Sequence, residues 1–158
     1  MTGGRVSKAF KYLGERDRDF FFTYGDAVSD IDIAALYKRH LETGKKITIT
    51  AVHPAGRFGE ISLGKNGVVK GFQEKPQTTE GYVNGGFMVV NREFVTSFMS
   101  GGDEAFEGEP MQKATRASEL AAFCHDGFWQ CMDTAREYQI LNNLWNGGNA
   151  PWRKNWGD

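Results

Sequence analysis

The chain has 158 residues and a formal net charge of −1, and hydrophobic residues make up 40% of it. This is the size of one globular domain with a core of its own, so we expect a single domain over residues 1–158. A nearly neutral chain without a Lys/Arg run argues against nucleic acid and anionic membrane as main partners, because both require a concentrated basic face. The composition is compatible with a small polar or anionic ligand.

The cysteine content and the hydropathy of the chain indicate the cellular compartment in which we expect it. The two cysteines, Cys124 and Cys131, lack Cys-x-x-Cys spacing, which argues against a zinc ribbon and a disulfide framework. No apolar run reaches the roughly 18 to 20 residues that span a bilayer, and residues 1–5 carry no hydrophobic signal core. We therefore expect a cytoplasmic protein with reduced thiols and no membrane partner.

The first elements predict a helix and then a strand. Apolar residues at helical spacing predict a short amphipathic helix from about Arg5, with Gly14 as its stop and residues 2–4 as its opening turn. The aromatic run at 20–24 suits a strand buried on both faces, as in a parallel sheet. Asp26 follows its carboxyl end, where open α/β sheets bind ligands. Asp26 therefore fits a metal or ribose contact, and equally an Asx turn.

A strand–helix–strand unit continues the pattern. Asp30 precedes a helical stretch that ends at Gly44, so we expect Asp30 to cap a second helix. Residues 46–52 then form a β-branched strand. Asp30-Ile31-Asp32 also spells the Asp-x-Asp of metal-dependent glycosyltransferases, although helix capping accounts for it better.

A hairpin leads into the most unusual stretch of the chain. Residues 60–63 and 68–72 alternate around Asn66-Gly67, which is a strong hairpin signal. The cluster Glu74-Lys75-Pro76 lies at the end of the second hairpin strand.

Asn84-Gly85-Gly86 then begins a further core strand over residues 83–90. Its glycines permit positive φ or the close approach of a ligand, and Lys75 offers a compact charge suited to phosphate. The stretch fits an anion site and, equally, an ordinary loop with an exposed ion pair.

The rest of the chain is mainly helical by pattern. We expect helices over 92–99 and from Pro110, and a short strand over 120–123. Thr134 with Glu137 forms a capping box for the last helix. Its expected buried stripe consists of Ala135, Tyr138, Leu141 and Trp145.

Asp133, directly before that capping box, is the second carboxylate of interest. It favours the helix dipole as a plain N-terminal charge. With Trp129 and Gln130 beside it, it also suits the wall of a cleft.

Motifs spread along nearly the whole chain resemble those of the glucose-1-phosphate cytidylyltransferase family. Their order and spacing match, and Gly-Arg-Phe-Gly and the Trp-Gln-x-Met-Asp-Thr run are specific to this branch of the sugar nucleotidyltransferases. The motifs are Met1-Thr2-Gly3-Gly4-Arg5, Phe22-Thr23-Tyr24-Gly25-Asp26, Pro54-Ala55-Gly56-Arg57-Phe58-Gly59, Phe72-Gln73-Glu74-Lys75-Pro76, Asn84-Gly85-Gly86-Phe87 and Gly127-Phe128-Trp129-Gln130-Cys131-Met132-Asp133-Thr134.

The resemblance implies a reaction and roles for particular residues. The family joins CTP and glucose 1-phosphate to give CDP-glucose and pyrophosphate, with Mg²⁺ held by two aspartates, which are similar in position to Asp26 and Asp133. Lys75 resembles the lysine that contacts the sugar phosphate. The expected substrate-binding residues, by their places in the same motifs, are Arg5, Tyr24, Gly25, Glu74, Asn84, Gly85 and Trp129.

The printed sequence also departs from the family pattern. It lacks the Gly-Gly-x-Gly-Thr-Arg loop that cradles the triphosphate in the family. We therefore expect a partial α/β nucleotidyltransferase fold, with a Rossmann-like mixed sheet, flanking helices and missing N-terminal strands. The implied cytidylyl transfer, a step of polysaccharide biosynthesis, is expected to be impaired or absent. The alternative is a non-catalytic sugar-phosphate-binding or oligomerising module, and we expect homo-oligomers through the exposed sheet edge at 20–24.

Overall fold

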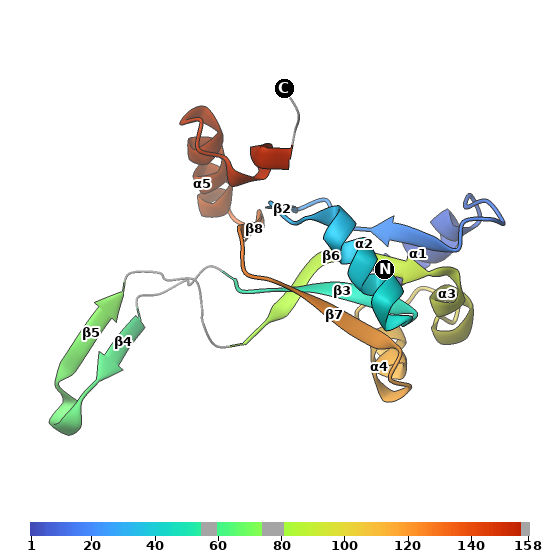
Figure 1. Cartoon of the computed structure of the whole chain (residues 1–158), viewed down its shortest axis with the longest axis horizontal. Helices are drawn as coiled ribbons and strands as arrows, with labels where there is room; N and C mark the ends of the chain where they lie inside the picture. The colour runs from blue at the N-terminus through green and yellow to red at the C-terminus, as the bar shows by residue number, and fades with distance from the viewer. Residues whose placement is uncertain (55–59, 74–80, 156–158) are drawn as a thin grey trace. The chain divides into compact units, whose positions relative to one another are not determined.

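The computed structural model describes residues 1–54, 60–73 and 81–155 (Figure 1). The helices are α1 (Thr2–Phe10), α2 (Ile33–Thr43), α3 (Arg92–Phe98), α4 (Glu109–Arg116) and α5 (Ala135–Asn146), with short 3₁₀ segments η1 (Lys65–Gly67) and η2 (Pro151–Asn155). The strands are β1 (Asp19–Phe22), β2 (Ala27–Ser29), β3 (Ile47–Val52), β4 (Glu60–Leu63), β5 (Val69–Gln73), β6 (Val83–Asn91), β7 (Leu120–His125) and β8 (Trp129–Cys131). None of the helices in these ranges is long and apolar enough to cross a bilayer.

The chain divides into two compact units, here called the first and the second unit. The first unit comprises Met1–Gly25, Asp32–Thr50 and Gly86–Cys124. The second unit comprises the described parts of Asp26–Ile31, Ala51–Gly85 and His125–Asp158.

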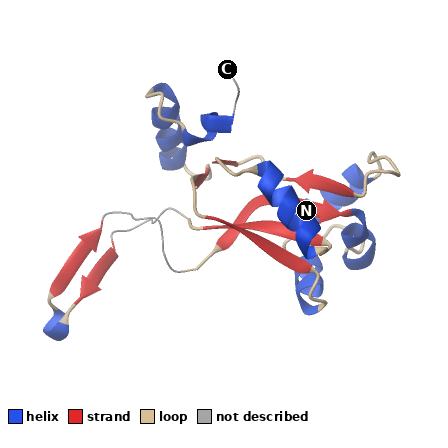
Figure 2. Cartoon of the chain, in the orientation of Figure 1, coloured by secondary structure: helices blue, strands red, loops and turns tan. Residues whose placement is uncertain are grey.

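A four-stranded mixed sheet in the order β1-β6-β3-β7 is the framework of the first unit (Figure 2). β1 pairs with β6 in antiparallel register, from Asp19 opposite Asn91 to Phe22 opposite Met88. The Asn91 N–H donates to the Lys46 carbonyl at 2.8 Å, so the end of β6 lies beside the start of β3 and these strands run in opposite directions. β7 starts beside the start of β3, so β1, β3 and β7 share one direction.

The core of the first unit forms where this sheet meets α1, α3 and α4. The aromatic side chains are in direct contact: the ring centroid of Phe106 lies 5.0 Å from that of Phe22 and 5.3 Å from that of Phe94. Each such side chain stabilises the fold by about 1.5–3 kcal/mol when fully buried. The buried cluster consists of Val6, Ile47, Met88, Val90, Phe94, Val95, Phe106, Met111 and Ala114.

β1 is an end strand of this sheet, and it is not buried on both faces as its aromatic run predicted. Within the described part of the chain it pairs with β6 alone. The Phe21 side chain is 55% exposed and touches Tyr37 on one side, with ring centroids 5.8 Å apart. The exposed sheet edge thus exists, and self-association through it stays a prediction.

The helix boundaries differ from the predicted ones at three places. One is the end of α1, which lies at Phe10 with Lys11 as its C-cap rather than at Gly14. α1 begins at Thr2 rather than near Arg5, because the Gly3 N–H donates to the Glu104 carbonyl at 2.9 Å and holds the first turn in place. Asp32 caps α2 instead of Asp30, and its Oδ1 accepts the Ala35 N–H at 2.9 Å.

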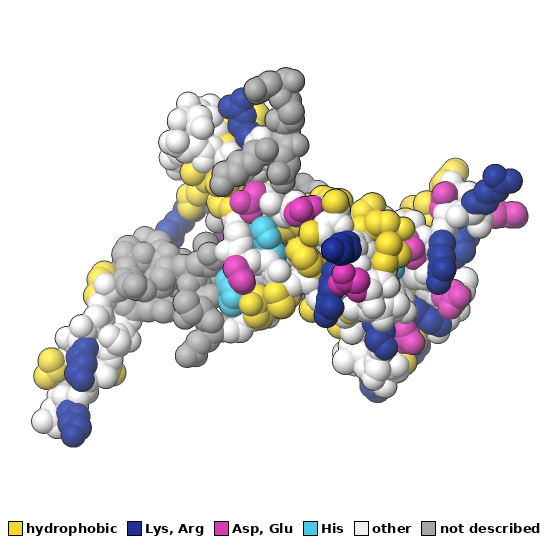
Figure 3. All heavy atoms as spheres, in the orientation of Figure 1, with side chains coloured by type: hydrophobic (Ala, Val, Ile, Leu, Met, Phe, Trp, Pro, Cys, Tyr) yellow, Lys and Arg dark blue, Asp and Glu magenta, His cyan; other side chains and the backbone are white. Residues whose placement is uncertain are grey.

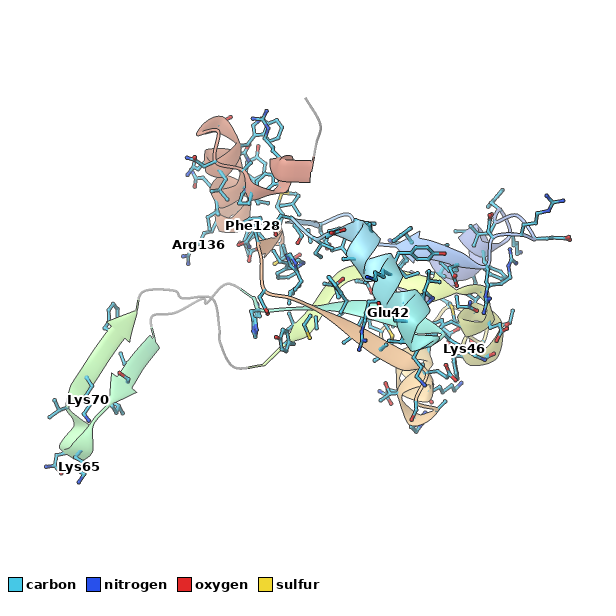
Figure 4. All side chains as sticks on the ribbon, in the orientation of Figure 1. Glu42, Lys46, Lys65, Lys70, Phe128 and Arg136 are labelled. Carbon is cyan, nitrogen blue, oxygen red and sulfur yellow. The ribbon has the colours of Figure 1, made fainter. Side chains whose placement is uncertain are left out.

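The second unit contains two separate two-stranded ribbons, β2–β8 and β4–β5. The β4–β5 hairpin confirms the turn predicted at Asn66-Gly67, where both residues have positive φ of 63° and 75°. Lys65 and Lys70 project from it (Figure 4), and hydrophobic side chains of the hairpin lie in the open beside them (Figure 3). These exposed side chains are Ile61, Leu63, Val68, Val69 and Phe72.

α5 opens with the predicted capping box of Thr134 and Glu137. Its expected buried stripe is wrong, because Tyr138 is 58% and Trp145 45% exposed. The following η2 packs back on the second unit through Trp152, whose ring centroid lies 5.4 Å from that of Phe128.

A buried polar network supports the first unit and predicts a large cost for one substitution. The Asp19 carboxylate, 9% exposed, accepts from Asn91 Nδ2 at 2.7 Å and lies 3.4 Å from His40 Nε2. Asp19→Ala leaves both partners without their acceptor and should lower the free energy of unfolding by about 2–3 kcal/mol. Urea unfolding measures this.

The matched control is Glu42→Ala on the exposed face of α2 (Figure 4). It should change the free energy of unfolding by less than about 0.5 kcal/mol. Equal stability of the two variants would contradict a structural role for the network.

Candidate functional site

The β2–β8 ribbon brings the two candidate metal aspartates to one end of the second unit's smallest sheet. Ala27 lies opposite Cys131 in the antiparallel register. One step further, the Met132 N–H donates to the Asp26 carbonyl at 2.7 Å. Because Asp133 directly follows Met132, the backbones of Asp26 and Asp133 are near neighbours across the ribbon, and both residues are exposed.

A side-chain hydrogen bond joins this ribbon to the Asn-Gly-Gly stretch. Trp129 Nε1, at the start of β8, donates to the Gly85 carbonyl at 2.8 Å. Gly85 is buried, whereas its neighbour Asn84 is exposed near the start of β6. Two hydrogen bonds therefore connect the candidate residues of the second unit. One reaches Asp26 from the residue before Asp133, and the other joins Trp129 to Gly85.

Asp133 also belongs to a group of possible metal ligands with Cys131 and Glu137, whose ligand atoms lie within 4.8 Å of one another. Burial, together with the nearby carboxylates of Glu137 and Asp133, raises the pKa of the Cys131 thiol to about 11, so the thiol is protonated at neutral pH. The Glu137 carboxylate already accepts the N–H groups of Asp133 and Thr134, at 2.8 and 2.9 Å. Cys131 is thus protonated and Glu137 already accepts two hydrogen bonds, so Asp133 is the residue of the three that is best suited to a hard cation.

Tyr24 and Gly25 lie in the first unit, directly after β1. The Tyr24 hydroxyl donates to the Glu107 carboxylate, which also accepts the Thr2 hydroxyl at 2.9 Å. Burial alone would raise the pKa of Glu107, but these hydrogen bonds outweigh it and lower that pKa. Glu107 was missed from the sequence, since nothing in its local pattern points to a partner 83 residues away.

Arg5, the remaining candidate of the first unit, is exposed on α1. It lines the rim of an otherwise apolar cavity of about 280 Å³ between α1 and β1. The other lining residues are Val6, Ala9, Phe10, Leu13, Phe20, Phe21 and Phe22.

Gly86, the second glycine after Asn84, is constrained by its backbone and by its surroundings. It has a φ of 81°, and a Cβ there would lie 2.7 Å from the Tyr24 ring. Both the backbone conformation and the available space therefore require glycine here, and the positive φ confirms one of the two alternatives predicted for these glycines, whereas the close approach of a ligand stays a prediction.

A Ser-His-Asp grouping that sequence spacing did not reveal lies between β2 and β7. His125 Nε2 is 3.0 Å from Asp30 Oδ1 and 3.3 Å from Ser29 Oγ. A catalytic relay needs these partners on opposite ring nitrogens. Because both face the same nitrogen, the grouping is a structural link, and it explains why Asp30 does not cap α2.

Glu74 and Lys75 lie outside the described residues, as do residues 55–59 of the Gly-Arg-Phe-Gly motif. Their expected roles therefore stay predictions.

Gly86→Ala should destabilise the chain by about 2–4 kcal/mol, because the substitution adds backbone strain and a clash with Tyr24. Gly101→Ala is the matched control, since Gly101 also has a positive φ, 78°, but open space around its Cβ. That control should cost only about 1 kcal/mol. Thermal unfolding compares them, and similar losses would mean that contact with Tyr24 does not constrain Gly86.

The raised pKa of Cys131 predicts slow alkylation. With a pKa of about 11, the thiolate fraction at pH 9 is roughly 1%, and the rate should rise about tenfold per pH unit to pH 10. Iodoacetamide labelling followed by peptide mass spectrometry measures the profile, with the urea-unfolded chain as control. A plateau at or below pH 9 in the folded chain would contradict the assignment.

Known proteins resemble this chain in sequence and in fold. The chain is 44% identical to the glucose-1-phosphate cytidylyltransferase of Salmonella typhimurium over 153 residues, which cover 97% of this chain and 58% of that relative. It is 27% identical to the catalytic subunit beta of mannose-1-phosphate guanylyltransferase from Drosophila melanogaster, over 90% of this chain and 39% of that one. The chain thus spans little more than half the length of its Salmonella relative.

Solved structures show the same fold. A protein assigned as a glucose-1-phosphate thymidylyltransferase from Bacillus anthracis matches with a TM-score of 0.64 and 14% identity, over 100% of this chain and 63% of that one. HddC from Yersinia pseudotuberculosis matches with a TM-score of 0.58 and 20% identity, over 88% of this chain and 60% of that one. The sequence model described as nucleotidyl transferase matches residues 3–144, and the chain belongs to this family.

Proposed function

We propose that this chain binds glucose 1-phosphate and supplies the sugar-phosphate side of cytidylyl transfer. In that reaction an oxygen of the sugar phosphate attacks the α-phosphorus of CTP, the bond to the β-phosphate breaks, and CDP-glucose and pyrophosphate result. The observation that carries the proposal is the 44% identity to a glucose-1-phosphate cytidylyltransferase along 97% of the chain.

Asp26 and Asp133 are the proposed ligands of Mg²⁺. The donor set fits, because Mg²⁺ is usually held by one or two carboxylates together with phosphate oxygens and water. The link from the Met132 N–H to the Asp26 carbonyl supports a shared position. When bound, the ion would neutralise charge on the reacting phosphates. Cys131 is not included because its thiol is protonated at neutral pH, and Glu137 is not included because its carboxylate caps α5.

Asn84 and Gly85 are the proposed sugar contacts. An exposed amide such as that of Asn84 offers both a donor and an acceptor to sugar hydroxyls. Gly85 has no side chain and would let the backbone approach the sugar closely. Its carbonyl accepts a hydrogen bond from Trp129 Nε1. We assign Lys75 to the sugar phosphate and Glu74 to the glucose from their motif alone. Arg5, Tyr24, Gly25 and Trp129 complete the proposed substrate-binding set.

Binding of the sugar phosphate and turnover make different demands, because turnover also requires contacts to the triphosphate of CTP. Binding without turnover is the second candidate function. Release of pyrophosphate from CTP, Mg²⁺ and glucose 1-phosphate by the pure chain distinguishes the two. The binding proposal requires only that the sugar phosphate is held.

Glucose 1-phosphate should raise the melting temperature of the chain, and a ligand at 100 times its Kd adds about 2.7 kcal/mol of stability. Lys75→Ala should abolish this shift, because it removes the proposed charge on the phosphate. The shift is measured by calorimetry with and without the sugar phosphate.

Lys65→Ala, at the tip of the β4–β5 hairpin (Figure 4), is the matched control and should keep the shift. Glucose without phosphate should give none. The proposal fails if the parent chain shows no shift at millimolar glucose 1-phosphate.

A further inference from the structure

Three side chains from separate segments of the second unit converge beside the start of β6. His53 follows β3, Tyr82 directly precedes β6, and Asp126 follows β7. Histidine and acidic side chains lie next to one another on this face of the molecule (Figure 3). The proposed function gives no role to any of the three.

Contacts join all three side chains. The Tyr82 hydroxyl donates to Asp126 Oδ1 at 3.1 Å, and His53 Nε2 lies 3.6 Å from the same oxygen. The rings of His53 and Tyr82 are stacked, with centroids 4.1 Å apart and planes inclined by 34°. His53 Nδ1 lies 2.9 Å from the Gly81 carbonyl. Asp126 thus binds the residue before β6 directly, and it also lies beside the histidine whose ring stacks on that residue.

The segment from the end of β7 to the first residue of β8 makes contacts on both sides of Asn84. Asp126 binds Tyr82, and Trp129, three positions further along the chain, binds the Gly85 carbonyl at 2.8 Å. Asn84 lies between these two points of attachment and is itself exposed. A segment held on both sides of one residue fixes the direction in which that residue's side chain is presented.

The exposure of Asp126 argues against a role in packing alone. Its side chain is 75% exposed, and a hydrogen bond at such a site contributes little to global stability. Its effect should instead be local, because it limits the motion of the residues at the start of β6.

We propose that Asp126 is a positioning residue, which acts through Tyr82 and His53 to hold Asn84 in place for the sugar of glucose 1-phosphate. This inference rests on the proposed function for its ligand, but the ordering of residues 81–86 is independent of that ligand. Asp126→Ala removes the acceptor, whereas Asp126→Asn keeps a carbonyl oxygen for the Tyr82 hydroxyl.

The test compares these variants of the full chain by two measurements. Hydrogen exchange of the peptide covering residues 81–86 should speed up about fivefold or more in Asp126→Ala and in Tyr82→Phe, as expected when one hydrogen bond is lost. The Kd for glucose 1-phosphate, measured by calorimetry, should rise about fivefold in the same variants. Asp126→Asn should restore both values to within about twofold, a rescue that general destabilisation would not produce.

Two controls keep the expected effects specific. Glu42→Ala removes an exposed carboxylate on α2, and Tyr12→Phe removes the hydroxyl of a tyrosine that is 91% exposed. Neither should change either measurement.

The proposed function and this inference can fail separately. If the parent chain does not bind glucose 1-phosphate, the proposed function fails, and the positioning role is decided by hydrogen exchange alone. The positioning role is overturned if Asp126→Ala matches Glu42→Ala in exchange at 81–86, or if Asp126→Asn is as impaired as Asp126→Ala.

Discussion

The pairing of β2 with β8 is the constraint on which the candidate site depends. Three residues on each strand pair, and the hydrogen bond from the Met132 N–H to the Asp26 carbonyl extends that pairing by one step. Without it, two aspartates more than 100 positions apart in the sequence would have no reason to lie near each other. A two-stranded ribbon of this length is marginal alone, so its flanking contacts matter. The capped start of α5 and the bond from Trp129 to Gly85 both adjoin β8.

Hydrogen bonds rather than apolar packing determine the local geometry at the candidate residues. Asp133 is positioned through its backbone N–H by Glu137, Gly85 through its carbonyl by Trp129, and Tyr24 through its hydroxyl by Glu107. This leaves the side chains of Asp133 and Asn84 at the surface, where a ligand could reach them. The apolar core lies elsewhere, among the sheet and helices of the first unit.

Local signals in the sequence predicted local structure well. The capping box at Thr134, the stop at Gly44 and the Asn66-Gly67 turn each involve neighbours only, and the structure confirms all three. The β2–β8 ribbon was missed because three-residue strands carry no periodicity. Asp30 was taken for a cap because its partners, His125 and the Phe128 N–H, are distant in sequence.

The sequence motifs predicted individual residues of the candidate site but not how these residues group in space. Asp26, Asn84 and Asp133 stand out by residue type and position, but their grouping follows from long-range pairing that no local pattern encodes. Glu107 and Asp126 illustrate the limit, since each binds a tyrosine more than 40 residues away in the sequence.

The most direct test of the account is a count of bound Mn²⁺ by electron paramagnetic resonance, with Mn²⁺ standing in for Mg²⁺ because both prefer carboxylate and water ligands. If Asp26 and Asp133 hold the ion together, one Mn²⁺ site should be strengthened by glucose 1-phosphate, lost in Asp26→Asn and in Asp133→Asn, and kept in Glu137→Gln. A site that survives in Asp26→Asn but disappears in Glu137→Gln would place the cation at Cys131, Asp133 and Glu137 instead, and would contradict the account.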